Sequence, residues 1–216
     1  MAKAYVVVDN VSKTIKGNDI LRNITTEFER GKIHGIIGRN GSGKSMLLKI
    51  ISGLTPPSSG QVIINGKVLG KDFDFPPKMS CIIESPGFLS GESGFNNLRY
   101  LQSLTRKPDK KQIAELLEMV GLKDHMHKKV GKYSTGMKQR LGLAQVLMDE
   151  SDFIILDEPL SGLDDAGMNQ FRMIFLELRK QGKTLIIATH IPEDVDSLCD
   201  TVSRMSDGRF SVSKGR

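Results

Sequence analysis

The sequence predicts an α/β protein with a parallel sheet and one nucleotide site. Three observations lead to this prediction. The phosphate-binding pattern G-x-x-x-x-G-K-S lies at residues 38–45, between a strand-like and a helix-like run. The last third of the chain alternates short apolar runs with helical periodicity, as parallel strands joined by helices do. Between these parts, from about residue 90 to 150, the apolar period is helical and predicts an inserted helical subdomain.

The first part of the chain predicts β-structure. Three short segments are rich in β-forming residues, and the last leads directly into the phosphate loop: 4–9, 24–28 and 32–37. After the following helix, segment 61–64 precedes Asn65 and Gly66, a pair typical of a tight hairpin turn. We therefore expect a small antiparallel β subdomain beside the parallel sheet.

The remaining elements follow from spacing. In the middle region, apolar residues recur at i, i+3, i+4 and i+7 before a glycine that suits a helix end: Ile113, Leu116, Leu117, Val120 and Gly121. In the last third, an apolar stripe over 171–178 predicts a helix that ends near Gly182. Apolar runs at 153–156 and 184–189 flank this helix and predict two neighbouring strands. All 216 residues are expected to form one domain.

The phosphate loop supplies three kinds of contact. Its glycines let backbone N–H groups turn toward phosphate oxygens, and the helix that follows directs its positive end at the same anion. Lys44 adds a charge for the outer phosphates, and the Ser45 hydroxyl is placed to bind Mg²⁺. The predicted loop residues are Gly38, Arg39, Asn40, Gly41, Ser42, Gly43, Lys44 and Ser45. Alone, the loop leaves kinases, GTPases and motor ATPases open.

Two adjacent acids narrow that choice. Asp157 ends an apolar strand, where the carboxyl edge of a parallel sheet faces the ligand crevice, and an acid there can hold magnesium. Glu158 follows and points differently, so we expect it to act as general base toward an attacking water. The alternative is a pair of solvated acids at the start of a loop, which the preceding apolar run and Pro159 disfavour.

Ser134 begins another predicted helix. As an N-cap alone it would contribute about 1 kcal/mol to helix stability, an ordinary structural role. A capped N-terminus with Gly136 two residues later is also a second anion site, because it carries exposed N–H groups and a positive dipole end. Two phosphate sites in one small chain suggest that two copies associate head to tail.

Composition restricts the remaining possibilities. The longest apolar runs are far shorter than a membrane span, and the apolar N-terminal stretch is too short for a signal peptide, so we expect cytoplasmic residence. Cys81 and Cys199 form no C-x-x-C pair, which favours reduced thiols over a disulfide or metal site. The net charge of +6 comes mostly from scattered basic residues and is interpreted as a solvated surface. No nucleic-acid partner is expected.

Four motifs of this chain together resemble the nucleotide-binding subunit of ATP-binding cassette (ABC) transporters. In order along the chain, they are the phosphate loop, residues 133–137, residues 153–158 and Thr189-His190. The resemblance covers nearly the whole length. It implies a P-loop NTPase fold of ABC type, an ATPase activity that needs ATP and Mg²⁺, and a separate transmembrane permease subunit. It also implies a position on the cytoplasmic face of the membrane.

The resemblance further implies a dimer that encloses two ATP molecules. Each ATP would be held by the phosphate loop of one copy and by Ser134 and Gly136 of the other. Residues 161–164 match the family's D-loop along the dimer seam, and His190 matches the switch histidine that contacts the terminal phosphate. Glu158 would be the catalytic base beside it.

Three departures from the family pattern matter. Thr135 replaces the first glycine of the L-S-G-G-Q signature, which makes a left-handed backbone there improbable. Ile15 replaces the aromatic residue that stacks on adenine, so we expect weaker ATP binding and less discrimination against GTP. Glu84 replaces the Q-loop glutamine, and its carboxylate would strengthen metal coordination.

Glu84 also suggests a subtype. With the surrounding segment 82–87 and Asn97-Leu98, it is similar to the bacitracin-resistance and lantibiotic-immunity group of bacterial exporters. We therefore expect an exporter of a peptide antibiotic, lantibiotic or drug-like substrate, with Glu84 as a metal-sensing link to the helical subdomain. The alternative for Glu84 is a loop residue that merely occupies the position.

Two other functions stay open. A soluble ABC-type ATPase in DNA repair or translation would reuse the same motifs, although such proteins usually carry coiled-coil insertions or two cassettes. A regulatory subunit that binds ATP with little turnover is the second alternative, which the Asp157-Glu158 pair and His190 disfavour.

Overall fold

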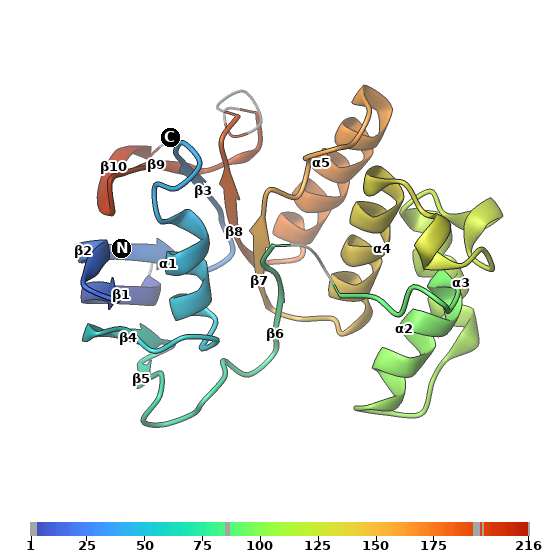
Figure 1. Cartoon of the computed structure of the whole chain (residues 1–216), viewed down its shortest axis with the longest axis horizontal. Coiled ribbons are helices and arrows are strands. Elements are labelled where there is room, and N and C mark those ends of the chain that lie inside the picture. The colour runs from blue at the N-terminus through green and yellow to red at the C-terminus, as the bar shows by residue number, and fades with distance from the viewer. Residues whose placement is uncertain (1–3, 85–86, 192–194, 196, 216) are drawn as a thin grey trace.

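A computed structural model describes residues 4–84, 87–191, 195 and 197–215. Ser85 and Pro86, which belong to the segment that suggested a subtype, lie outside the described residues. The central element is a six-stranded sheet with the order β10-β9-β3-β8-β7-β6 (Figure 1). Its strands are β3 (Ile33–Ile37), β6 (Met79–Ile82), β7 (Phe153–Asp157), β8 (Thr184–Thr189), β9 (Thr201–Ser206) and β10 (Arg209–Gly215). All neighbours pair in parallel except β9 and β10.

The parallel arrangement confirms the predicted α/β class and follows from the strand sequences. Strands β7 and β8 are buried at every position, so they read as continuous apolar runs rather than alternating ones. Because the strands are parallel, the carboxyl ends of β3, β6, β7 and β8 meet at one edge of the sheet. This edge is where the candidate site lies.

A second sheet is antiparallel and has the order β2-β1-β4-β5. Its strands are β1 (Ala4–Ile15), β2 (Asn18–Glu29), β4 (Ser59–Ile64) and β5 (Lys67–Val68). The β4–β5 hairpin turns at Asn65 and Gly66, as predicted. The first two strands extend well beyond the predicted segments 4–9 and 24–28, which were therefore too short. Their ends at the hairpin tip, residues 13–15 and 18–20, are exposed or half-buried, and cross-strand pairing holds them.

Helices lie on both sides of the parallel sheet. Helix α1 covers one side, between this sheet and the antiparallel strands, whereas the other helices lie beyond β7 (Figure 1). The helices are α1 (Lys44–Ile51), α2 (Gly94–Ser103), α3 (Lys110–Met119), α4 (Thr135–Met148) and α5 (Asp165–Lys180), with short 3₁₀ turns η1 (Lys123–His125) and η2 (Val130–Lys132). No helix in the described part of the chain is both long and apolar enough to cross a membrane.

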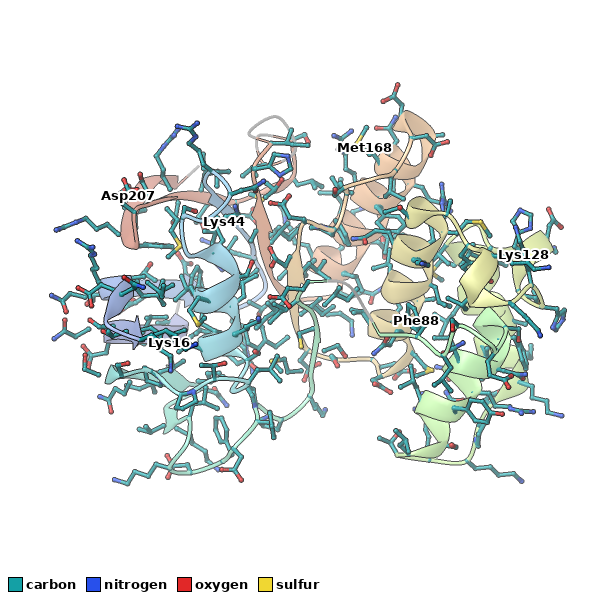
Figure 2. All side chains as sticks on the ribbon, in the orientation of Figure 1. Lys16, Lys44, Phe88, Lys128, Met168 and Asp207 are labelled. Carbon is teal, nitrogen blue, oxygen red and sulfur yellow. The ribbon has the colours of Figure 1, made fainter. Side chains whose placement is uncertain are left out.

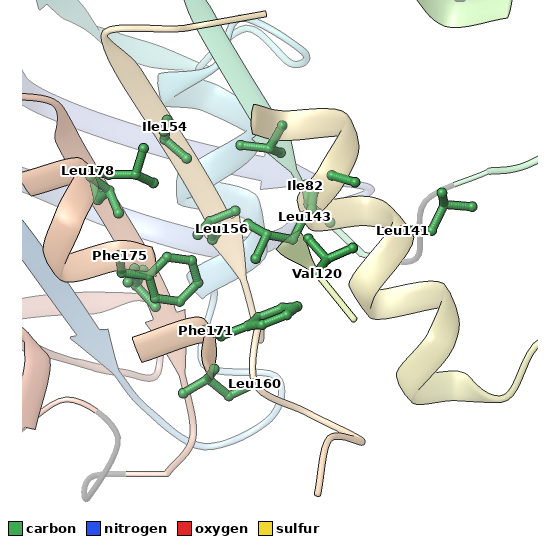
Figure 3. Packing of buried hydrophobic residues seen from close by; sticks show 14 of the residues in the cluster. Ile82, Val120, Leu141, Leu143, Ile154, Leu156, Leu160, Phe171, Phe175 and Leu178 are labelled. Carbon is green, nitrogen blue, oxygen red and sulfur yellow. The ribbon is translucent and has the colours of Figure 1, made fainter. Parts of the chain in front are cut away.

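Buried apolar side chains join these layers. Successive side chains of β7 point to opposite faces of the sheet. Ile154 and Leu156 belong to a cluster with α4 and α5, whereas Phe153 and Ile155 belong to a cluster with α1 and the antiparallel sheet. In Figure 3 the β7 side chains lie between those of α4, including Leu143, and those of α5. The strand is thus fixed by packing on both faces, which positions the acids at its end.

Candidate functional site

The carboxyl edge of the parallel sheet gathers most of the predicted site residues. The phosphate loop follows β3, Glu84 follows β6 after one intervening residue, Asp157 ends β7, and His190 follows β8. Gly38 donates its backbone N–H to the Thr189 carbonyl across 3.3 Å, which ties the loop to the end of β8. Figure 2 shows Lys44 at the beginning of α1, at this edge of the molecule.

The phosphate loop leaves the N-terminus of α1 open. Gly43 is the N-cap with φ of 106° and makes no side-chain cap hydrogen bond to the first turn. A Cβ at Gly43 would lie 2.8 Å from Leu21 Cδ2 and 2.9 Å from Met205 Cε, so both the backbone angle and the packing require glycine. The free N–H groups of the first turn are therefore available to an anion.

Lys44 is buried inside this loop, with 6% of its surface exposed. Its ammonium group donates to the Gly38 carbonyl at 2.7 Å and to the Arg39 carbonyl at 3.3 Å. The Glu158 Oε1 atom lies 3.7 Å away. A buried ammonium whose partners are loop carbonyls and one carboxylate can also pair with a more strongly charged anion, such as a phosphate group.

Asp157 is 7% exposed and lies beside Ser45. The Ser45 hydroxyl and the Glu84 backbone N–H face its carboxylate closely enough to affect the pKa of that group. Burial raises the pKa of the Asp157 carboxyl, and the charge of Glu158 raises it further, whereas the Ser45 hydrogen bond, the charge of Lys44 and the Glu84 N–H lower it.

Three buried oxygens here have no hydrogen-bond partner among the described residues: Ser42 Oγ, Asp157 Oδ1 and Glu158 Oε1, the last of which lies 3.7 Å from Lys44 Nζ. Such orphan atoms are expensive unless a ligand satisfies them. A carboxylate, the Ser45 hydroxyl and a nearby phosphate cradle form the oxygen donor set that Mg²⁺ prefers. The residues present therefore suit a magnesium–nucleotide complex.

Glu158 occupies a left-handed backbone conformation with φ of 50°, which is uncommon for glutamate. Its Oε2 atom lies 2.9 Å from His190 Nδ1 and 3.4 Å from the His190 backbone nitrogen, which donates to it. The Glu158 backbone N–H in turn donates to the Ala188 carbonyl at 2.8 Å. The sheet edge thus holds Glu158, His190 and Lys44 together.

Glu84 lies close to the site through its backbone, but its side chain points elsewhere. The carboxylate is 64% exposed and forms an ion pair with Lys49, with Nζ and Oε1 separated by 2.5 Å. Its φ of 64° is again left-handed. The backbone of Glu84, the predicted metal ligand, therefore lies beside Asp157, whereas the Glu84 carboxylate forms an ion pair with Lys49 of α1.

Ser134 and Gly136 lie at the N-terminus of α4, apart from the phosphate loop. In Figure 1 the N-termini of α1 and α4 face the same edge of the molecule, with β7 and β8 between them. The Ser134 hydroxyl accepts the Met137 N–H at 3.2 Å, as expected of an N-cap. A Cβ at Gly136 would lie 2.8 Å from the Gly162 carbonyl oxygen, so glycine allows α4 to pack against the predicted D-loop.

Two further positions complete the comparison with the sequence. Thr135 is the first residue of α4 and has no left-handed backbone, consistent with its β-branched side chain. Ile15 ends β1 at the hairpin tip and is 39% exposed. This exposure is compatible with an adenine contact but supplies no aromatic surface.

Sequence reasoning missed two residues that contact the site. Gln139 of α4 donates its side-chain amide to the Glu158 carbonyl at 3.2 Å and to the Pro159 carbonyl at 3.0 Å. Lys49 forms the ion pair with Glu84. Neither has a local sequence signal, because each contact joins segments that are distant in the chain.

The comparisons with known proteins agree with this geometry. The family model for "ABC transporter" matches residues 21–161. A Bacillus subtilis protein called "Uncharacterized ABC transporter ATP-binding protein YybJ" is 40% identical over 97% of this chain and 96% of its own. The chain therefore belongs to the ABC transporter ATP-binding proteins, and the resemblance noted from its motifs is confirmed.

Two relatives have more specific names. The "Bacitracin transport ATP-binding protein BcrA" of Enterococcus faecalis is 34% identical over 97% of this chain and 69% of its own. The "Lantibiotic transport ATP-binding protein SrtF" of Streptococcus pyogenes is 33% identical over 96% of this chain and 89% of its own. These relatives favour the transport interpretation over DNA repair or translation.

Solved structures confirm the fold. CbiO1 from Clostridium perfringens, described as part of the ABC transporter complex cbiONQ, has a TM-score of 0.80 and 28% identity over 96% of this chain and 87% of its own. The ATP-binding cassette MJ0796, in a dimeric post-hydrolysis structure with ADP and Pi, has a TM-score of 0.87 over 98% of this chain and 100% of its own. Its 23% identity supports the fold alone.

Proposed function

We propose that this chain is the ATP-hydrolysing motor subunit of a bacterial ABC exporter. The observation that carries the proposal is the position of Glu158: its two carboxylate oxygens lie against Lys44 and His190, at the edge where the phosphate loop begins. A carboxylate held at that point is suited to accept a proton from a water that attacks the terminal phosphate of ATP.

Each of the other residues has a role in this proposal. Residues 38–45 bind the phosphates, and Lys44 moves from the loop carbonyls to the outer phosphates when ATP binds. Ser45 and Asp157 would hold Mg²⁺, with Glu84 as a further ligand. When bound, the ion would neutralise charge that develops on the phosphate oxygens. His190 orients Glu158 and contacts the terminal phosphate.

The proposed active unit is a dimer that encloses two ATP molecules. Within one chain the N-terminus of α4 is separated from the phosphate loop, so Ser134 and Gly136 need a second copy to reach a nucleotide. Dimer closure on ATP and opening after hydrolysis would move a separate transmembrane permease at the cytoplasmic face of the membrane. Shifting such an equilibrium from 1:99 to 99:1 takes about 5.5 kcal/mol of differential binding.

The cargo class follows from the relatives alone. BcrA and SrtF are described as bacitracin and lantibiotic transport proteins, so we propose a peptide antibiotic, a lantibiotic or a drug-like molecule as substrate. Copurification from native membranes would identify the permease. Expression of the pair in a sensitive strain should raise resistance to the cargo.

The first test is the variant Glu158→Gln. We expect it to retain nucleotide binding and to lose phosphate release by at least about 100-fold, because general base catalysis typically contributes 10²–10⁴-fold. ATP should then hold the variant as a long-lived dimer in analytical ultracentrifugation. Glu115→Gln, at an exposed carboxylate on α3, is the matched control and should behave like the wild type.

Two results would contradict this assignment. Rapid turnover by Glu158→Gln would remove Glu158 as the base. No phosphate release by the wild-type chain, with nucleotide binding intact, would favour instead the ATP-binding subunit with little turnover that the sequence left open.

A further inference from the structure

The Glu84 side chain and its backbone face in different directions. The backbone N–H faces the Asp157 carboxylate closely enough to lower the pKa of that group, which places residue 84 beside the proposed magnesium ligands. The carboxylate is instead paired with Lys49 at 2.5 Å and is 64% exposed. A group that belongs to the site by its backbone is thus held outside the site by a lysine.

Lys49 is placed for this contact by the helix that carries the phosphate site. It follows Ser45 by four residues on α1, so the two side chains lie on the same face, one turn apart. The contacts form a closed path: Ser45 faces Asp157, Asp157 faces the Glu84 N–H, and the Glu84 carboxylate forms an ion pair with Lys49. Lys49 and a metal ion beside Ser45 are therefore alternative partners for one carboxylate.

We propose that Lys49 is a positioning residue that holds Glu84 away from the metal until Mg²⁺–nucleotide binds, and thereby sets the Mg²⁺ requirement of nucleotide binding. The proposal rests on the proposed function, because it takes Ser45 and Asp157 as the metal ligands. It gives the glutamate at this position a defined partner in each state: Lys49 before Mg²⁺–nucleotide binds and the metal afterwards.

The exposure of the pair sets the size of the effect. A surface ion pair is typically worth up to about 1 kcal/mol, which corresponds to about fivefold in an equilibrium constant. Lys49 is 28% exposed and Glu84 is 64% exposed, so solvent screens the pair. An ion pair of this strength can shift the Mg²⁺ concentration that nucleotide binding requires, and Mg²⁺ binding can still break the pair.

The test measures Mg²⁺ dependence of nucleotide binding without turnover. A non-hydrolysable ATP analogue is titrated by calorimetry at a series of Mg²⁺ concentrations. In Lys49→Met, which removes the charge and keeps the length, we expect the half-saturating Mg²⁺ concentration to fall about three- to fivefold. Lys49→Arg should retain the wild-type value, because it preserves the ion pair.

A double-variant comparison isolates the pair. In the Glu84→Gln background the side chain has no charge for Lys49 to hold, so adding Lys49→Met should cause no further change. Lys123→Met is the matched control, since Lys123 and Glu118 also form a 2.5 Å ion pair but lie in the helical part of the chain. It should leave the Mg²⁺ dependence unchanged.

Several outcomes would overturn the proposal. They are an unchanged Mg²⁺ dependence in Lys49→Met, an equal shift in the Glu84→Gln background, or an equal shift in Lys123→Met. A change in melting temperature alone would mean that Lys49 only stabilises the C-terminal end of α1. If the wild type binds and hydrolyses ATP in these cases, the positioning role fails and the proposed function stands. Wild-type nucleotide binding that ignores Mg²⁺ would overturn both.

Discussion

The N-termini of α1 and α4 are both anion sites in principle, yet they differ in how much of a binding site surrounds them. At α1, Gly43 leaves the first-turn N–H groups uncapped. Beside them lie Lys44 and three buried oxygens that lack a hydrogen-bond partner among the described residues. At α4, the Ser134 hydroxyl already caps the helix, and Ser134 and Thr135 are exposed. The first site is nearly complete within one chain, whereas the second is a capped helix end that, in the proposed dimer, would meet a phosphate held by another copy.

This contrast predicts that the N-terminus of α4 contributes to nucleotide binding only through association of two copies. In Ser134→Ala we expect ATP-dependent dimer affinity to fall by about 100-fold or more. Each of two symmetric sites would lose a hydrogen bond to a charged group, worth about 1.5–3 kcal/mol. Nucleotide binding by the single chain should not change. Analytical ultracentrifugation in the Glu158→Gln background measures the first quantity, and calorimetry measures the second.

Ser93→Ala is the matched control for this variant. Ser93 caps α2 in the same way, with its hydroxyl accepting the Asn96 N–H at 3.1 Å. Both variants should lose about 1 kcal/mol of helix capping and about 2–4 °C in melting temperature. Equal dimer affinity in the two variants would mean that Ser134 is only a cap, and the difference between the two helix N-termini would then have no functional meaning.

The site at α1 could be predicted from the sequence because its signals are local. The phosphate loop is a fixed spacing, and β7 and β8 are apolar runs whose ends coincide with the predicted ones to within one residue. Since parallel strands end at one edge, Asp157 and His190 had to lie near the loop. The geometry of Glu158 against Lys44 and His190 follows from this topology.

Other parts of the structure have no such local signal. Beyond Val11 in β1 and before Leu21 in β2, the residues are mostly polar and exposed or half-buried, so apolar alternation indicated only the inner ends of these strands. The Lys49–Glu84 pair joins residues 35 positions apart, and the Gln139 contact with Glu158 spans 19 positions. Such tertiary contacts depend on how elements pack, and one sequence does not contain that information.

Adenine binding gives a second test of the difference between the two helix N-termini, because a change at the adenine contact should affect only the site at α1. In Ile15→Tyr we expect ATP affinity to rise about fivefold or more. An aromatic stack on a base is worth about 1–3 kcal/mol in nucleic-acid binders. Ile15 is 39% exposed at the hairpin tip, so a larger side chain has room there. Preference for ATP over GTP should rise together with affinity.

The control for this variant is Val212→Tyr. Val212 is 66% exposed on β10, so the change adds a tyrosine to an exposed strand position away from the hairpin tip. It should leave both affinities unchanged. An Ile15→Tyr protein with wild-type affinity for both nucleotides would show that the base does not contact residue 15.

The smallest expected effect concerns Asp157, whose unpartnered oxygen marks the site at α1 as one prepared for a ligand. Without nucleotide, Asp157→Asn should raise the free energy of unfolding by about 1 kcal/mol and the melting temperature by about 2–4 °C, because it removes a buried charge lacking full compensation. Asp152→Asn, at an exposed acid just before β7, should give no gain.

The pH dependence of this gain has a definite sign. Burial raises the pKa of the Asp157 carboxyl in the folded protein above its value in the unfolded chain, so the folded state binds this proton more tightly. The wild type therefore recovers stability as pH falls through the raised pKa toward about 3.9, the ordinary value for aspartate. The advantage of Asp157→Asn should be full at neutral pH and shrink across that acidic window in thermal melts.

Adding Mg²⁺ and nucleotide at neutral pH should reverse the order of stability, since only the wild type retains the charge that binds the metal. An asparagine variant that is less stable than the wild type without ligand would show that the Asp157 charge is already satisfied within the chain, and the site at α1 would then differ from that at α4 in geometry alone.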